Sequence, residues 1–129
     1  YQLNLAFAPL LMATPASHAD IIHVGDYVSS RGSRKHSAYA ASKAAQDSLT
    51  HSFAAKLAPK VKVNSLAPAL MLFNEDDDQA YRERALAKSV MRREGGLEEF
   101  QHAVDYLLAS GYVTGRVLPV DGGRHLVGG

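Results

Sequence analysis

The residues of this 129-residue sequence best suited to chemistry are a tyrosine and a lysine four positions apart, Tyr39 and Lys43. On an α-helix this spacing places the phenol and the ammonium group on one face. A neighbouring cation favours the phenolate, so Lys43 is expected to lower the pKa of Tyr39. A phenol with a lowered pKa can pass a proton near neutral pH. An ordinary solvated pair on a helix surface is the alternative, and the pair alone does not separate the two.

Three further motifs accompany this pair. Asp26 precedes Tyr39 by thirteen residues and follows a short β-branched run that ends at Val24. Residues 63–69 read Val-Asn-Ser-Leu-Ala-Pro-Ala, and residues 120–126 read Val-Asp-Gly-Gly-Arg-His-Leu. Single short motifs arise by chance, but several in a fixed order and spacing are far more specific.

The elements that must position these motifs alternate between strands and helices. Hydrophobic periodicity and breaker residues predict strands at 20–24, 61–67 and 117–120, and helices at 3–12, 38–58, 79–91 and 97–108. This alternation is typical of an α/β fold with a doubly wound parallel sheet. Ligands of such sheets bind beyond the carboxyl ends of the strands. The predicted sites therefore follow Val24, Ala67 and Val120.

In these motifs the sequence resembles the short-chain dehydrogenases/reductases, in which Tyr-x-x-x-Lys opens a long helix and a catalytic Ser lies thirteen residues earlier. Asp26 stands at that Ser position, as in the pteridine reductases of the family. Residues 20–23, 35–43, 62–68 and 121–126 look especially like pterin reductases of the dihydromonapterin type. The likeness runs from about Asp20 to Leu126, with Ala69 in place of a usual glycine.

The resemblance implies reduction of a pterin, dihydromonapterin or a dihydrofolate-like compound, by hydride transfer from NADPH. Tyr39 would relay the proton and contact the cofactor and the substrate. Lys43 would hold the nicotinamide ribose. Asp26 would help to place the pterin and feed protons.

Other positions receive roles from the same resemblance. The family uses an Asn in the helix before the catalytic strand, and Asn4 is the candidate, with an ordinary polar residue as the alternative. Pro68, Ala69 and Leu70 would run past the nicotinamide. After them, Leu72 and Phe73 are candidates for an apolar wall against the pterin, with core packing as the alternative.

Composition limits the classes of function. Hydrophobic residues make up 47% and charged residues 21%, as in a soluble globular protein of one domain. A net charge of +1 gives no bulk attraction to nucleic acid or to an anionic membrane. The longest apolar stretch is too short to span a bilayer. Without cysteine there are no disulfides, which fits a cytoplasmic location, and the six histidines show no metal-ligand spacing.

The glycine-rich fingerprint that opens a helix onto a dinucleotide pyrophosphate is missing. Residues 1–129 are therefore expected to form the C-terminal, catalytic part of a Rossmann-like domain, and NADPH rests on the resemblance. A carbonyl reductase with another substrate, or a non-catalytic truncated piece, are the alternatives. A homo-oligomer, as a tetramer, is expected from apolar helix residues beyond those a half-domain can cover, namely Leu49, Phe53, Leu57, Phe100, Val104 and Leu107.

Overall fold

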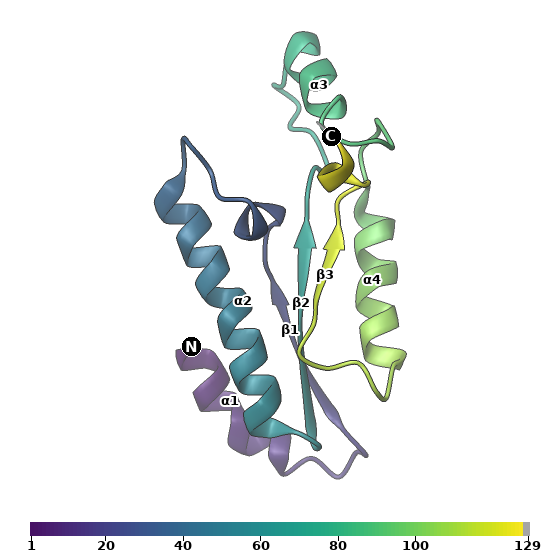
Figure 1. The fold of residues 1–129 in the computed structure, drawn as a ribbon. Coiled ribbons are helices and arrows are strands. Elements are labelled where there is room, and N and C mark those ends of the chain that lie inside the picture. Colours follow the sequence, from purple (N-terminus) through teal and green to yellow (C-terminus); the bar gives the residue numbers. More distant parts are fainter. Residues whose placement is uncertain (128–129) are drawn as a thin grey trace.

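Three short runs rich in β-branched residues form a parallel sheet, as predicted. The computed structural model describes residues 1–127, with strands β1 (Ala19–Val24), β2 (Val61–Pro68) and β3 (Val117–Val120). The strand order is β1-β2-β3, with Ile21 opposite Val63 and Leu66 opposite Leu118. All three strands point the same way, so their carboxyl ends meet at one end of the molecule (Figure 1).

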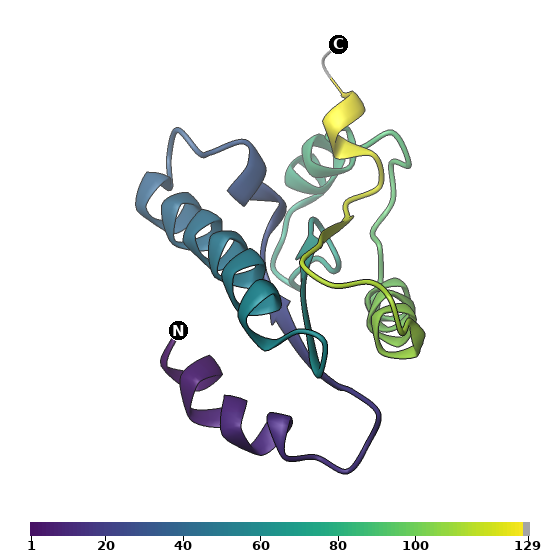
Figure 2. The ribbon, with the colours of Figure 1, turned by 60° about the horizontal axis from the view of Figure 1, so that its bottom comes forward.

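Helices cover both faces of this sheet. Helices α1 (Gln2–Met12) and α2 (Ser37–Leu57) lie on one side, and α4 (Leu97–Ala109) lies on the other (Figures 1 and 2). Two short 3-10 turns, η1 (Tyr27–Ser30) and η2 (Arg124–Leu126), and helix α3 (Gln79–Leu86) gather beyond the carboxyl ends of the strands. The doubly wound α/β arrangement expected from the sequence is thereby confirmed for the part of the domain that this chain contains.

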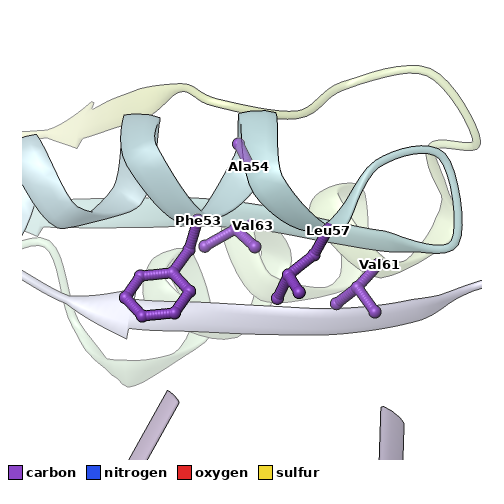
Figure 3. Packing of buried hydrophobic residues seen from close by; sticks show 5 residues of the cluster. All are labelled: Phe53, Ala54, Leu57, Val61 and Val63. Atoms are coloured by element: carbon purple, nitrogen blue, oxygen red, sulfur yellow. The ribbon is translucent and has the colours of Figure 1, made fainter. Parts of the chain in front are cut away.

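The core lies between α2 and the sheet (Figure 3). Phe53 and Leu57 are one helical turn apart and share a face, while Val61 and Val63 share a face of β2. Phe53 and Leu57 are only 3% and 5% exposed, and Leu107 of α4 is 1% exposed. The expectation that these three side chains supply a surface for assembly is therefore wrong, because the chain buries them itself.

Several element boundaries differ from the sequence prediction, most of them by one residue. Helix α3 ends at Leu86 and not at Met91, because the backbone N–H of Met91 donates to the Gly122 carbonyl at 3.2 Å and Arg92 has a φ of 50°. Residues 27–30, which lie outside the predicted helices and strands, form η1, and β2 continues through Pro68. Within residues 1–127 no helix combines the length and the apolar character needed to cross a bilayer.

Candidate active site

Asp26, Tyr39 and Lys43 come together at the carboxyl end of β1. The Tyr39 hydroxyl donates to Asp26 Oδ2 at 2.9 Å. The Lys43 ammonium donates to the Val24 carbonyl at 2.9 Å and lies 5.8 Å from the centre of the Tyr39 ring. The thirteen-residue spacing thus connects the end of a strand to the first turn of the following helix.

Local backbone geometry fixes the position of Asp26. Its Oδ1 accepts from the Val28 N–H at 2.8 Å and so caps η1. The preceding Gly25 donates its N–H to the Leu66 carbonyl at 2.7 Å. A Cβ at Gly25 would lie 2.9 Å from Ser65 Oγ and 3.1 Å from the Leu66 carbonyl, so only glycine allows this approach of the chain to β2.

The pKa of Tyr39 is raised, which contradicts the expectation that Lys43 would lower it. The main cause is the hydrogen bond that the hydroxyl donates to Asp26, followed by desolvation and by the negative charge of Asp26. A carboxylate acceptor stabilises the protonated phenol, and the Lys43 ammonium points to a carbonyl instead. Tyr39 is therefore a weaker acid than an isolated phenol, and its hydroxyl proton points to the Asp26 carboxylate.

Pro68, Ala69 and Leu70, predicted to run past a nicotinamide, lie at the end of β2, with Pro68 as its last residue. The Ala69 N–H donates to the Val120 carbonyl at 3.0 Å, and the Leu70 carbonyl accepts from the Gly95 N–H at 3.1 Å. Leu70 has a φ of 53°, which is unusual for a branched residue. Ala69 and Leu70 line a cavity of about 300 Å³, whereas Asp26 lines a separate one of about 430 Å³. Two backbone groups of the residues expected beside the nicotinamide, the Ala69 N–H and the Leu70 carbonyl, are thus already engaged within the chain.

The structure does not bring Leu72 and Phe73 to the cavity beside Asp26. Leu72 is 56% exposed, while the Phe73 ring packs edge-on against Tyr81 at 6.2 Å and beneath the Arg82 guanidinium at 5.1 Å. Phe73 thus packs on α3, and the role of both side chains as a substrate wall stays a prediction.

Asn4 is buried and contacts a histidine rather than the Tyr39 group. His23 Nε2 lies 2.9 Å from Asn4 Nδ2, and His23 Nδ1 lies 2.7 Å from Thr50 Oγ1. Because the Thr50 hydroxyl donates to the Gln46 carbonyl at 3.1 Å, His23 Nδ1 carries the proton and Nε2 accepts from Asn4. Burial lowers the pKa of His23, which agrees with a neutral ring. Within residues 1–127 the Asn4 side chain has no hydrogen bond to Tyr39, Lys43 or Asp26.

The sequence analysis missed the side chains around the cavity beside Asp26. Tyr27, Arg31, Lys88 and Arg124 line it together with Asp26. The charges of the loop at Arg31 and of the closing motif at Arg124 were the available signals, but nothing in their spacing shows that they converge. In the part of the chain that the structure describes, no group of three or more His, Asp or Glu side chains is placed to hold a metal ion.

Comparison with known proteins places the chain in a family. A sequence model of the family described as Enoyl-(Acyl carrier protein) reductase matches residues 2–125. The chain belongs to this family, a branch of the short-chain dehydrogenases/reductases, as the sequence motifs indicated.

Individual relatives give a more specific likeness within the family. The chain is 60% identical to the dihydromonapterin reductase of Escherichia coli strain K12 over 126 residues, which cover 98% of this chain and 52% of the relative. The chain thus spans about half the length of the curated relatives it matches. A short-chain dehydrogenase/reductase from Burkholderia xenovorans superposes with a TM-score of 0.84 at 30% identity, over 98% of this chain and 50% of that one. An apo SCOR enzyme from Clostridium thermocellum gives a TM-score of 0.81 at 25% identity, over 97% and 48%.

Proposed function

We propose that these residues form the catalytic part of an NADPH-dependent pterin reductase that acts on dihydromonapterin or a dihydrofolate-like compound. The observation that carries this proposal is the hydrogen bond of 2.9 Å from the Tyr39 hydroxyl to Asp26, at a position where the family usually has Ser. The 60% identity to dihydromonapterin reductase supports the choice of substrate.

The residues present suit the nicotinamide-ribose end of the cofactor. Lys43 is half-buried at the end of β1 and has one hydrogen bond, to Val24, so two ammonium donors remain for ribose hydroxyls. When bound, NADPH supplies the hydride that adds to the carbon of a ring C=N bond. Residues 1–127 contain no Gly-x-Gly-x-x-Gly turn between a strand and a helix for the pyrophosphate, since Gly95 and Gly96 lead into α4 but follow α3 and not a strand. These residues therefore account for one end of the cofactor only.

The chain's own contribution is proton transfer and orientation. Tyr39 donates its proton to the ring nitrogen as the adjacent carbon gains the hydride, which leaves a phenolate. The Lys43 ammonium, 5.8 Å from the centre of the Tyr39 ring, carries the positive charge that would stabilise that phenolate, although it does not lower the pKa of Tyr39 in this structure. Asp26 accepts the Tyr39 hydrogen bond beforehand and so holds the hydroxyl beside a carboxylate that lines the cavity.

Asp26 also favours a pterin over a ketone. A carboxylate can accept hydrogen bonds from the N–H and amino groups of a pterin, but it cannot donate to the alkoxide that forms from a ketone. The Ser hydroxyl that is usual at this position can donate. A carbonyl reductase is therefore the less favoured alternative.

The test uses the full-length polypeptide that carries these residues, with NADPH oxidation followed by absorbance. We expect faster oxidation with dihydromonapterin than with simple ketones. Tyr39→Phe lowers kcat by roughly 10²–10⁴-fold, as expected for loss of a proton donor. Asp26→Ser lowers kcat/KM for the pterin more than for a ketone.

A matched control separates chemistry from folding. Tyr112→Phe removes a hydroxyl from a side chain that is 97% exposed, so kcat is expected to stay at the wild-type value. Equal or better pterin turnover after Asp26→Ser would remove Asp26 from its assigned role. Turnover of ketones but of no pterin would favour the carbonyl reductase.

We also propose that the full-length protein is a homo-oligomer, a tetramer. Apolar side chains of α1 support this proposal, since Leu3, Phe7 and Leu10 are 72%, 52% and 68% exposed. Light scattering at high protein concentration is expected to show an oligomer, and a monomer would contradict the proposal.

A further inference from the structure

The cavity beside Asp26 is lined by more positive charge than the catalytic group requires. It measures about 430 Å³ and is formed by η1, the loop after it, the segment after α3, and η2. Arg31, Lys88 and Arg124 line it, and Asp26 is its single acidic residue. Three cations and one carboxylate leave an excess of positive charge at the surface that faces the site of reduction.

Protein carboxylates do not neutralise these cations. Within residues 1–127, neither Arg31, Lys88 nor Arg124 makes an ion pair. The Asp26 carboxylate is already engaged, since one oxygen accepts from the Val28 N–H and the other accepts from Tyr39. The charge of the cavity is therefore available to a ligand.

Tyr27 holds the two guanidinium groups in place. Arg31 Nη1 donates to the Tyr27 hydroxyl at 3.1 Å, and the Arg124 guanidinium lies over the Tyr27 ring at 5.5 Å. One aromatic side chain, placed directly after the capping residue Asp26, thus positions an arginine from each side of the cavity. A pair of positioned guanidinium groups suits the planar, bidentate recognition of carboxylates and phosphates.

We propose that Arg31, Lys88 and Arg124 form an anion subsite that binds a negatively charged group on the side chain of the substrate. This inference rests on the proposed reductase function and adds a feature of the substrate, namely an anion beyond the pterin ring. A glutamate carboxylate and a phosphate ester share the required chemistry. Asp26 itself would face the pterin ring, and the three cations would face the group attached to it.

The first experiment measures discrimination between charged and neutral substrates in the full-length polypeptide. The variant carries Arg31→Gln, Lys88→Gln and Arg124→Gln. We expect the ratio of kcat/KM for dihydrofolate to kcat/KM for the uncharged dihydromonapterin to fall by about tenfold or more. The matched control carries Lys35→Gln, Lys56→Gln and Arg116→Gln, three exposed cations outside the cavity, and should leave the ratio unchanged. An equal fall in both variants, or no fall in either, would overturn the proposal.

The second experiment needs no turnover and separates the subsite from the reaction. Calorimetric titration uses p-aminobenzoylglutamate, which has the carboxylates without the pterin, and inorganic phosphate in a parallel arm. Binding of at least one probe should weaken about fivefold or more in the cavity variant and at high salt, and should persist in the control variant. The probe whose binding weakens identifies the anion as a carboxylate or a phosphate.

The outcomes distinguish the two proposals. If the wild-type protein reduces no pterin but binds a probe through the three cations, the reductase proposal fails and the anion subsite remains. If pterins are reduced but the wild-type protein binds neither probe, the subsite is wrong and the reductase proposal remains. Arg124→Lys, which keeps the charge and loses the planar fork, is expected to fall between wild type and Arg124→Gln in probe binding.

Discussion

Replacing Lys62 with Met should strongly destabilise the protein, because this lysine is buried at the centre of the sheet. It lies in β2 and is only 5% exposed. Its ammonium lies 2.9 Å from Asp20 Oδ1 of β1 and donates to the Leu107 carbonyl at 2.7 Å and to the Ser110 carbonyl. One cation therefore links a neighbouring strand to the C-terminal end of α4.

The magnitude follows from the groups that Lys62→Met would leave behind. The Asp20 side chain is 12% exposed, and the ion pair is the sole polar contact of its Oδ1 within residues 1–127. Removing one member of a buried ion pair costs about 3–5 kcal/mol, since the other charge stays buried. The two carbonyls at the end of α4 also lose their donor. We expect a loss of about 3–5 kcal/mol in the free energy of unfolding, a large part of the total of about 5–15 kcal/mol for a domain.

Urea unfolding of the full-length polypeptide, followed by circular dichroism at one protein concentration, measures this loss. The control Lys56→Met, at an exposed position in the last turn of α2, should change stability by less than about 0.5 kcal/mol. The double variant Asp20→Asn/Lys62→Met should be less destabilised than the sum of the single variants by at least about 1 kcal/mol. A loss below about 1 kcal/mol for Lys62→Met, or strict additivity, would refute the reasoning.

Three further predictions concern a glycine, a histidine and the isolated chain. Gly123→Ala should destabilise the folded protein by more than about 1 kcal/mol, and by more than Gly32→Ala does. Both glycines have a φ near 75°. A Cβ at Gly123 would lie 2.5 Å from a methyl group of Val90, whereas the space at Gly32 is open. Because the pKa of His23 is lowered from 6.5 by burial, the unfolded chain binds its proton first, so the free energy of unfolding should fall as the pH drops below about 6.5. A pH titration of stability should show a flatter profile for His23→Gln than for the wild-type protein, and equal profiles for the two would contradict the assignment. The isolated 129-residue chain should bind NADPH weakly and be poorly soluble or oligomeric, which fluorescence titration tests; micromolar binding with pterin-dependent oxidation would contradict it.

The sequence predicted the structure correctly where residues close together along the chain determine the local geometry. Asp26 and Tyr39 meet because one ends a strand and the other begins the helix that packs on it, so their spacing already predicts their contact. The strand positions followed from β-branched runs, but the burial of β2 on both faces did not follow from its composition, because β2 contains the buried polar residues Lys62, Asn64 and Ser65.

Contacts between residues that are far apart in the sequence explain the predictions that were wrong. The direction of the Tyr39 pKa shift depends on which charge approaches the hydroxyl most closely, and helical spacing to Lys43 does not reveal that the Asp26 carboxylate does so. The end of α3 is set by a hydrogen bond from Met91 to the turn after β3. The burial of Leu107 depends on how α4 lies on the sheet, which an amphipathic pattern leaves open because it predicts an apolar face but not its partner.

The division between local and distant contacts also separates the two functions proposed for this site. The proposed proton-relay group lies within residues 24–43, where the end of β1, η1 and the start of α2 hold Asp26, Tyr39 and Lys43. The proposed anion subsite adds Lys88 and Arg124 from segments far along the chain, and only the fold brings them beside Tyr27. Substitutions at these distant positions are expected to change which substrates the site accepts, while the hydrogen bond from Tyr39 to Asp26 stays intact. We therefore expect the proposed selection of the substrate to be partly separable from the proposed chemistry, because Lys88 and Arg124 lie outside the segment that holds Asp26, Tyr39 and Lys43, whereas Arg31 lies within it.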